Sequence, residues 1–572
     1  MKGNREFSPD WSEKPPDPGT YRSIFKWGGP DTFKHPNRKL YAVLKDRLQL
    51  TDDCFKSRRK EGRERVVLNR PIRLGDEHID GLRRIVGEVN VAVDDYSRAK
   101  FSGGKTTEEA LMLRRGMPRT VGDVVVHPRD KNDVRNIVDY CGEHGIPVYV
   151  YGGGSSVTFG LEAVKGGIVM VMSTHLNRVL NFNEADQTIT VEAGIMGPQY
   201  EAMLNDAPRV FNAKRRYTCG HFPQSFEYSS VGGWIVTLGS GQQSTYYGDI
   251  YDIVVSQEYI TPAGVFKTLE YPATATGPKI NDIMKGSEGA FGILVAATLK
   301  IFRYMPENRR RFAFMFPTWH AAVDAARETS QGEFGMPSVF RISDPEETDV
   351  ALKLYGIDGS ILDSLMKLRG YAPMQRCLLI GTADGERRFA ANVKNRVKKV
   401  CRAHGAMYLS GYPVKKWEHG RYTDPYMRED LNDFGIIIDT LETGVTWDGF
   451  HRLHEGVTRF IKTRPNTICM AHGSHFYPQG TNLYFIFILQ EDEIDDYRDF
   501  HGKIVDRIVE YGGSLSHHHG VGKLLAPWME PHLGTVQMNT LRALKRHFDP
   551  KNIMNPGGTL GLDLPDTGLR KR

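Results

Sequence analysis

The fold class follows from one glycine-rich stretch, Tyr151-Gly152-Gly153-Gly154-Ser155-Ser156-Val157. It comes directly after residues 146–151, an apolar run that predicts a β-strand. Consecutive glycines let the backbone turn its N–H groups toward one point, and such a concave set of donors binds phosphate or pyrophosphate. Taken alone, the stretch indicates a phosphate-binding loop and a plain glycine-rich turn about equally.

Two other nucleotide-binding patterns do not fit the chain. A Rossmann fingerprint needs a third glycine where Val157 stands, and no helical pattern opens there. A Walker loop would end at Gly104-Lys105-Thr106, but Ala99 occupies the position of its first glycine and no strand precedes it. A phosphate site at residues 152–157 therefore belongs to another kind of domain.

The segments around the loop predict a β-α-β-β unit. A strand at 123–126 is stopped by Pro128, Asp130 can cap the helix that follows, and Gly145 can end that helix. Further strands are predicted at 146–151, 168–172, 188–192, 253–259 and 294–302. This mixture of strands, helices and glycine-rich connections is typical of the α+β class.

Three more glycine-rich segments follow, and they can line one extended ligand together with the first loop. They are Phe226-Glu227-Tyr228-Ser229-Ser230-Val231-Gly232-Gly233-Trp234, Tyr246-Tyr247-Gly248-Asp249 and Gly286-Ser287-Glu288-Gly289-Ala290-Phe291-Gly292-Ile293-Leu294. Their order and spacing over about residues 120–303 resemble the FAD-binding domain of the vanillyl-alcohol oxidase family, also called the PCMH-type flavin domain. The resemblance implies an α+β protein with a PCMH-type two-subdomain FAD-binding domain and an α+β cap, or substrate, domain.

The resemblance also implies where FAD binds. The first loop would hold the pyrophosphate, the middle segments would approach the flavin ring, and the last segment would lie near the adenosine. In that order the residues are Gly152, Gly153, Gly154, Ser155, Ser156 and Val157; Ser225, Ser229, Ser230, Gly232 and Gly233; and Glu288, Ile293 and Val295. His127 is far from the loop in sequence, so we expect FAD to be bound without a covalent link.

From about residue 312 strands alternate with long helices, which predicts a second α+β domain. The chain is therefore expected to divide into four parts. These are an N-terminal helical and wrapping segment (1–119), the FAD-binding domain (120–303), the substrate or cap domain (304–515), and a histidine-rich segment with a helical tail (516–572).

The most distinctive chemistry lies in His517-His518-His519, which Gly520 and Gly522 follow. Imidazole donates or accepts a proton near neutral pH. On an extended segment His517 and His519 would share one face and His518 would point away. A zinc site with His472 and His475 is disfavoured because no carboxylate or thiolate stands at ligand spacing nearby, so no metal is expected. The flanking glycines also argue against an idle surface patch.

The histidine segment resembles that of the alkyldihydroxyacetonephosphate synthases, whereas related D-2-hydroxyacid dehydrogenases carry a shorter Glu-His-Gly version. Tyr484, in Asn482-Leu483-Tyr484-Phe485, is similar to the active-site tyrosine segment of the synthases, although a buried strand tyrosine is the alternative. Arg341 and Arg428 lie in segments that resemble substrate-facing arginines, and guanidinium suits a phosphate or carboxylate. For Arg341 alone a surface salt bridge is equally compatible. The resemblance runs over most of the chain.

The synthase resemblance implies a reaction without net redox change. Acyl-dihydroxyacetone phosphate would lose its fatty acid and take a fatty alcohol, while the flavin N5 holds the substrate covalently in between. Tyr484 would move a proton, His517 to His519 would act as acid, base or charge stabiliser, and Arg428 with Arg341 would hold the phosphate or the leaving carboxylate. The alternative is an FAD-dependent D-2-hydroxyacid dehydrogenase of the D-lactate or D-2-hydroxyglutarate type. A flavin-binding protein without catalysis is disfavoured by the clustered ionisable residues.

Composition sets the remaining expectations. The 572 residues carry a net charge of +6, which is too weak to indicate nucleic acid, and the six cysteines contain no CxxC pair. No secretory signal, membrane-spanning run or peroxisomal signal is recognised, so a cytoplasmic or membrane-peripheral protein is expected. Basic clusters at residues 56–65 and 309–311 indicate solvated surface or, less strongly, attraction to an anionic membrane. A homodimer is also expected.

Overall fold

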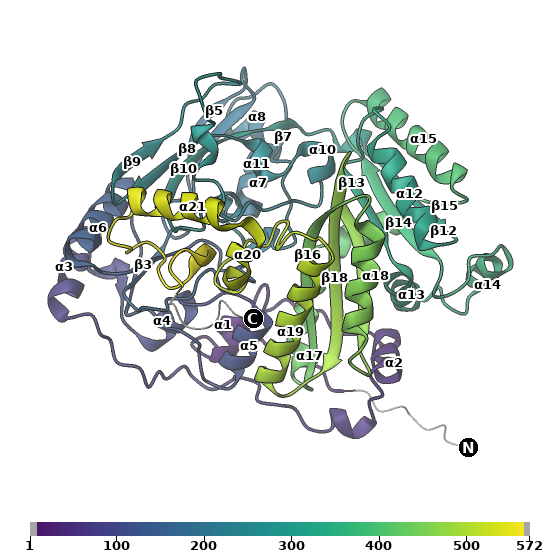
Figure 1. The fold of residues 1–572 in the computed structure, drawn as a ribbon, viewed down its shortest axis with the longest axis horizontal. Helices are drawn as coiled ribbons and strands as arrows, with labels where there is room; N and C mark the ends of the chain where they lie inside the picture. Colours follow the sequence, from purple (N-terminus) through teal and green to yellow (C-terminus); the bar gives the residue numbers. More distant parts are fainter. Residues whose placement is uncertain (1–8, 565–572) are drawn as a thin grey trace.

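The computed structural model describes residues 9–564, so the C-terminal segment 569–572, where no peroxisomal signal was recognised, lies outside the described residues. Figure 1 shows an N-terminal domain in purple and blue beside a second domain, the cap, in green, with the C-terminal helices in yellow across the first domain. This architecture confirms the predicted α+β class.

The first subdomain is built on a sheet with the order β1-β2-β4-β3. Asp130 accepts the N–H groups of Asn132 and Asp133 at the start of helix α6, and Gly145 ends it at φ +66°. These are the caps that the sequence predicts. The bounds are β1 Val91–Ala92, β2 Val124–Val126, β3 Val148–Tyr151, β4 Ile168–Val171 and α6 Lys131–His144.

The second subdomain is an antiparallel sheet with the order β5-β6-β10-β8-β9. Its strands are β5 Val179–Asn183, β6 Thr188–Glu192, β8 Val254–Thr261, β9 Gly264–Lys267 and β10 Ile293–Lys300. The associated elements are α7 Gly197–Asn205, α8 Ala207–Val210, β7 Tyr217–Thr218, α9 Val231–Val236, α10 Ser244–Tyr247, α11 Ile250–Ile253 and β11 Phe302–Arg303.

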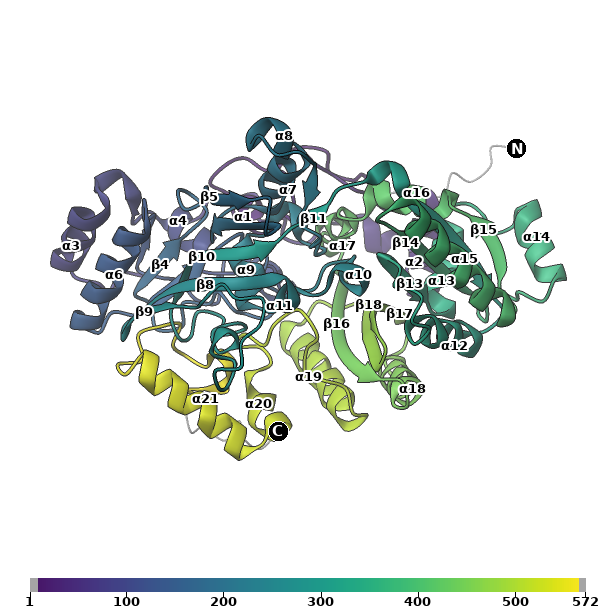
Figure 2. The same ribbon diagram turned by 90° about the horizontal axis from the view of Figure 1, so that it is seen from above.

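The cap domain carries an antiparallel sheet with the order β15-β12-β14-β13-β17-β18-β16. The strands are β12 Arg310–Phe316, β13 Val339–Ser343, β14 Cys377–Ala383, β15 Met407–Ser410, β16 Ile436–Thr446, β17 Ile468–Tyr477 and β18 Gly480–Gln490. The helices are α12 Trp319–Ser330, α13 Pro345–Leu354, α14 Ile361–Leu368, α15 Arg387–Ala403, α16 Tyr412–Gly420, α17 Arg428–Asn432, α18 Phe450–Ile461 and α19 Ile494–Glu510. Figure 2 shows α12, α15, α18 and α19 along the outer side of this sheet.

Strand alternation gives the cap sheet its two faces. Leu483, Phe485 and Phe487 of β18 pack into the buried core under the helices. The residues between them, Tyr484 and Ile486, face a cavity on the opposite side. Because successive strand residues point to opposite faces, burying the first set necessarily directs Tyr484 into the cavity.

The ends of the chain pack against both domains. Arg22 and Arg114 of the N-terminal segment form buried ion pairs with Asp433 of the cap. The C-terminal helices lie across the first domain (Figure 1). The elements are α1 Tyr21–Phe25, α2 Arg38–Arg47, α3 Asp76–Val86, α4 Asp95–Phe101, α5 Thr107–Arg114, α20 Met529–Leu533 and α21 Thr535–Phe548.

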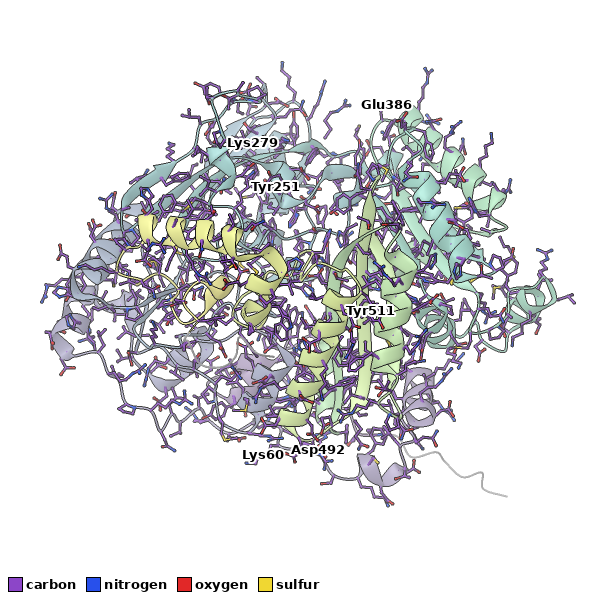
Figure 3. The ribbon with its side chains drawn as sticks, viewed as in Figure 1. Lys60, Tyr251, Lys279, Glu386, Asp492 and Tyr511 are labelled. Atoms are coloured by element: carbon purple, nitrogen blue, oxygen red, sulfur yellow. The ribbon has the colours of Figure 1, made fainter. Side chains whose placement is uncertain are left out.

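Nearby carboxylates neutralise much of the positive charge of the two basic clusters, residues 56–65 and 309–311. Arg59 pairs with Asp492, which Figure 3 labels beside Lys60 at one edge of the molecule. Arg58 and Arg63 both pair with Glu61. In the second cluster Arg309 pairs with Asp384, and Arg311 with Glu418. Both clusters therefore carry less net charge than their sequences suggest. Within residues 9–564 no helix has the length and apolar character needed to cross a bilayer.

Candidate active site

One cavity of about 940 Å³ lies between the FAD-type domain and the cap. One end is lined by the glycine loop 152–157, by the turn at residues 229–233 and by β10. The middle is lined by Tyr484, His518 and His519. The sequence-predicted cofactor and catalytic segments thus meet around one space.

The glycine loop offers free hydrogen-bond donors to this space. No described residue accepts a backbone N–H from residues 153–157. A Cβ on Gly153 would lie 2.2 Å from the carbonyl oxygen of Tyr228, so the loop rests directly on the neighbouring turn. Unpaired N–H groups converging on a cavity fit a pyrophosphate, and Met172, Ile293 and Leu294 supply apolar walls for rings. The residues present therefore fit FAD.

All the predicted cofactor residues line the cavity except Val295. Val295 is 1% exposed and lies in the apolar core, two residues beyond Ile293 along β10, where the strand has left the cavity wall. Val295 does not line the cavity itself, and its place near the adenosine stays a prediction. Ser229 and Ser230 line the cavity but also stabilise their own turn, since their hydroxyls accept the Trp234 Nε1–H and the Gly233 N–H.

Glu288 connects the first domain to the segment after the histidines. Its carboxylate accepts the N–H groups of Val521 and Gly522, both at 2.7 Å. Burial raises its pKa to about 7, although those two N–H groups oppose the shift. Glu288 thus fixes where the histidine segment meets the cofactor end of the cavity.

The histidine triplet forms a turn around a carboxylate that the sequence analysis did not identify. Glu442 of β16 accepts the backbone N–H groups of His517, His518 and His519 at 2.8–3.1 Å. Drawing three successive N–H groups to one anion curls the chain. The expectation of an extended segment with His518 pointing away is therefore wrong. His518 and His519 face the cavity, and His517 turns toward Tyr477.

Glu442 also bears on the reason given above for expecting no metal, which was the lack of a nearby carboxylate. Ligand atoms of Glu442, His517 and His518 lie within 4.8 Å of one another, so a carboxylate does stand beside the histidines. It escaped a search by spacing because it is 75 residues away from His517 in the chain. Its oxygens are already engaged by the three histidine N–H groups, by the Ser516 hydroxyl and by the Asn482 amide. The absence of a metal stays a prediction.

The electrostatics around Glu442 keep it ionised. Burial would raise its pKa, but His518, His519 and His517 outweigh burial and hold the pKa well below its usual value. Burial is the main cause that lowers the pKa of His519 to about 4, and Glu442 opposes that shift. His519 is therefore a neutral imidazole near pH 7.

Tyr484 lies on the cavity floor among aromatic rings. Its hydroxyl donates to Thr440 Oγ1 at 3.0 Å. Its ring stacks on His472 with centroids 4.9 Å apart and meets the edge of His519 at 5.6 Å. Burial raises its pKa to about 12, so the phenol keeps its proton at neutral pH.

Both predicted arginines line the cavity, and both already have carboxylate partners. Arg341 pairs with Glu347. Burial would raise the pKa of Glu347, but Arg341 and His472 hold it at about 2. Arg428 donates to Glu429 at 3.0 and 3.1 Å and to the Lys105 carbonyl. An anionic substrate would therefore meet paired rather than free guanidinium groups.

Other polar groups next to the site were not predicted. His475 is buried, and its Nδ1 lies 2.7 Å from the Ser244 hydroxyl. His221 is buried, neither ring nitrogen has a partner among the described residues, and burial lowers its pKa to about 3. His472 and His475 are three residues apart on β17, so simple strand alternation would place them on opposite faces. A register shift between Ser474 and Phe476, with His475 at φ +53°, brings both to the cavity.

The far end of the cavity is apolar. It lies under the face of the cap sheet that α13, α14 and α16 partly cover. Its lining includes Leu40, Leu44, Leu352, Ile357, Leu378, Ile380, Leu409, Ile438, Met470, Ile486 and Ile488.

Two family models divide the chain in the same way as the structure. Residues 122–270 match an FAD binding domain, and residues 305–559 match the C-terminal domain of FAD linked oxidases. A solved structure of p-cresol methylhydroxylase shares the fold at a TM-score of 0.66, with 15% identity, and covers 86% of this chain and 98% of its own. The fold and the site thus define a PCMH-type flavoenzyme with FAD as its cofactor.

More similar proteins narrow the class. The alkyldihydroxyacetonephosphate synthase of Dictyostelium discoideum is 32% identical over 482 residues, which cover 81% of this chain and 77% of the relative. A solved alkyldihydroxyacetonephosphate synthase superposes with a TM-score of 0.79 at 26% identity and covers 94% of this chain and 99% of its own. The chain belongs to the alkyldihydroxyacetonephosphate synthase family and is an FAD-dependent enzyme.

Proposed function

We propose that the protein exchanges the acyl chain of acyl-dihydroxyacetone phosphate for a long-chain fatty alcohol, with no net change in redox state. The observation that carries the proposal is the single cavity, in which an apolar end and a dinucleotide cradle meet at Tyr484, His518 and His519. An aliphatic chain is favoured in the apolar end because burying its CH₂ groups removes apolar surface from water.

The chain's own residues suggest distinct roles. Bound FAD would supply a nucleophilic ring nitrogen, N5, and the glycine loop 152–157 with the turn at 229–233 would hold it. Tyr484 keeps its proton at neutral pH and can move a proton reversibly at the carbon being substituted, so that it ends the turnover protonated. His518 faces the same space and can accept the alcohol proton. Arg341 and Arg428 orient the anionic part of the substrate. Each is also paired with a carboxylate, Glu347 or Glu429, which reduces its net positive charge.

We also propose that lipid substrates enter from a membrane surface beside α14. Ile361 and Leu368 on this helix are 90% and 84% exposed, which is unusual for large apolar side chains. Figures 1 and 2 place α14 at the outer edge of the cap, away from the FAD-binding domain. Its buried Met366 packs near Leu378 and Leu409, which line the apolar end of the cavity. The helix thus lies between the surface and the proposed chain-binding region.

The testing experiment is a product assay. Purified holoenzyme receives palmitoyl-dihydroxyacetone phosphate and isotope-labelled hexadecanol in detergent, and mass spectrometry follows the label. We expect labelled alkyl-dihydroxyacetone phosphate and free palmitate in equal amounts. Tyr484→Phe serves as the catalytic negative control. Palmitate release without label incorporation would indicate a hydrolase, and no turnover of either substrate would refute the proposal.

A further inference from the structure

A line of polar contacts leads from the histidines away from the cavity. Nδ1 of His518 lies 3.1 Å from Nδ1 of His517. Nε2 of His517 lies 2.8 Å from the Tyr477 hydroxyl. That hydroxyl donates in turn to Oδ2 of Asp249. Each contact is short enough to pass a proton along a hydrogen bond.

The two ends of this line have different surroundings. His518 lines the cavity. Asp249 is half-buried at the start of α11, and its Oδ1 is buried without a partner among the described residues. Its backbone N–H donates to the exposed Asp252 at 3.1 Å. Tyr477 ends β17 in the cap, whereas Asp249 belongs to the FAD-binding domain. The line therefore runs from the enclosed space to the domain boundary, where the exposed Asp252 stands beside Asp249.

The proposed reaction needs such an exit. One carbon–oxygen bond, to the fatty acid, is broken, and one to the alcohol is formed. The acid leaves as a carboxylate near neutral pH, so the hydroxyl proton of the alcohol remains in the cavity. Nothing is oxidised or reduced, and every turnover must deliver one proton to solvent. This step rests on the proposed function.

We propose that Tyr477 and Asp249 form the outer half of a proton relay, which carries the alcohol proton from His518 through His517 to solvent. Nε2 of His518 takes the proton, and Nδ1 passes one to His517. His517 donates from Nε2 to the Tyr477 oxygen while the Tyr477 hydroxyl proton moves to Asp249. Water then deprotonates Asp249. Before the next turnover the Tyr477 hydroxyl turns back toward Asp249, and His517 and His518 exchange protons with water to regain their starting tautomers.

The charges around the relay fit this direction. Glu442 lies 3.4 Å from Nδ1 of His518, where it stabilises a transient imidazolium, but its hydrogen-bonded oxygens and low pKa make it a poor proton acceptor. Burial and the Asp249 carboxylate raise the pKa of Tyr477. Its phenol therefore stays neutral and can pass a proton on without forming a phenolate. His475 lies beside His517 and His518, and burial lowers its pKa well below the usual value, so it does not compete for the proton.

The experiment compares Tyr477→Phe and Asp249→Asn with a matched pair outside the line. Tyr251, labelled in Figure 3, donates its hydroxyl to Asp282 Oδ2 at 2.6 Å on the FAD-binding domain, so Tyr251→Phe and Asp282→Asn remove a similar bond elsewhere. A pH indicator and rapid quenching measure proton release and fatty-acid release in one turnover. Both relay variants should bind FAD and keep KM, lose about 10- to 100-fold in kcat, and release protons late. Imidazole in the buffer should restore part of the rate.

If Tyr477 and Asp249 only held the two domains together, the variants would behave differently. Loss of that contact would lower FAD content or raise KM, and a diffusible base such as imidazole would not restore the rate. Wild-type kinetics in Tyr477→Phe, or a loss that imidazole leaves unchanged, would overturn the relay. If the wild type makes no ether product, the proposed function fails separately. The relay is then judged by ¹⁵N-histidine NMR, in which Tyr477→Phe must shift Nε2 of His517 and alter the proton shared with His518, and unchanged signals would refute it.

Discussion

The carboxylate of Glu442 accepts the backbone N–H of His518 at 3.1 Å and lies 3.4 Å from Nδ1 of the same residue. One side chain therefore fixes both the backbone and the charge of a histidine that faces the cavity. The same carboxylate binds the N–H groups of His517 and His519. Because Glu442 lies on β16, the geometry of the turn is coupled directly to the cap sheet.

Glu442→Gln should destabilise the protein and distort the histidine turn. A neutral amide cannot accept this set of N–H donors, and disrupting a buried charge network costs about 3 kcal/mol in free energy of unfolding. The folded-state pKa of Glu442 is depressed from 4.5, so its stabilisation is fully present above pH 4.5 and is lost as the pH falls through the folded value. Urea unfolding should show the full difference at pH 7 and a smaller one in acid.

Glu307→Gln is the control, because this exposed carboxylate pairs with Arg216 on the surface. It should change stability by less than about 1 kcal/mol. Equal stability of Glu442→Gln and the wild type at pH 7 would contradict the anchoring role.

Tyr484→Phe should abolish most turnover while FAD stays bound, because Tyr484 lines the cavity from the cap sheet, away from the glycine loop. A lost acid–base group typically lowers kcat by about 100-fold or more. Thr440→Val removes only the acceptor of this hydroxyl and should cost less. Product formation and flavin absorbance are measured for both variants, and full activity in Tyr484→Phe would remove the residue from the mechanism.

Structural features that depend on residues close together in the chain could be predicted from the sequence. The caps of α6, Asp130 and Gly145, follow from such a short pattern. The curl of the histidines could not be predicted in this way, because Glu442 enters from a strand 75 residues earlier. The sequence likewise does not show that β10 has left the cavity wall at Val295 and entered the core. Long-range contacts decided both outcomes.

Gly153→Ala should lose FAD. The added Cβ would lie 2.2 Å from the Tyr228 carbonyl and 2.7 Å from Ser229 Cα, and because both are backbone atoms the loop itself must shift. Displaced N–H groups no longer converge on the pyrophosphate. Gly142→Ala in α6 is the control, since its nearest neighbour would be 4.0 Å away. FAD released on denaturation is quantified for each. A fully loaded Gly153→Ala protein would argue against this loop as the cradle.

Charges on α14 should weaken binding to lipid. Ile361→Asp with Leu368→Asp would place carboxylates where large apolar side chains are exposed, and anionic bilayers repel them. We expect reduced co-sedimentation with phosphatidylcholine–phosphatidylserine vesicles and normal FAD content. Val536→Asp, at a residue 77% exposed on α21, is the matched control and should bind like the wild type. Equal binding of all variants would exclude α14 as the docking element.

The final prediction separates the synthase from the alternative, a D-2-hydroxyacid dehydrogenase. A dehydrogenase must reduce its flavin in every turnover, because hydride transfer is its chemistry. A synthase has no such step, so anaerobic mixing with D-lactate or D-2-hydroxyglutarate should leave the yellow colour intact. Mixing with acyl-dihydroxyacetone phosphate should change the flavin spectrum and release fatty acid. Rapid bleaching by a 2-hydroxy acid, without fatty-acid release from the lipid substrate, would decide in favour of the dehydrogenase.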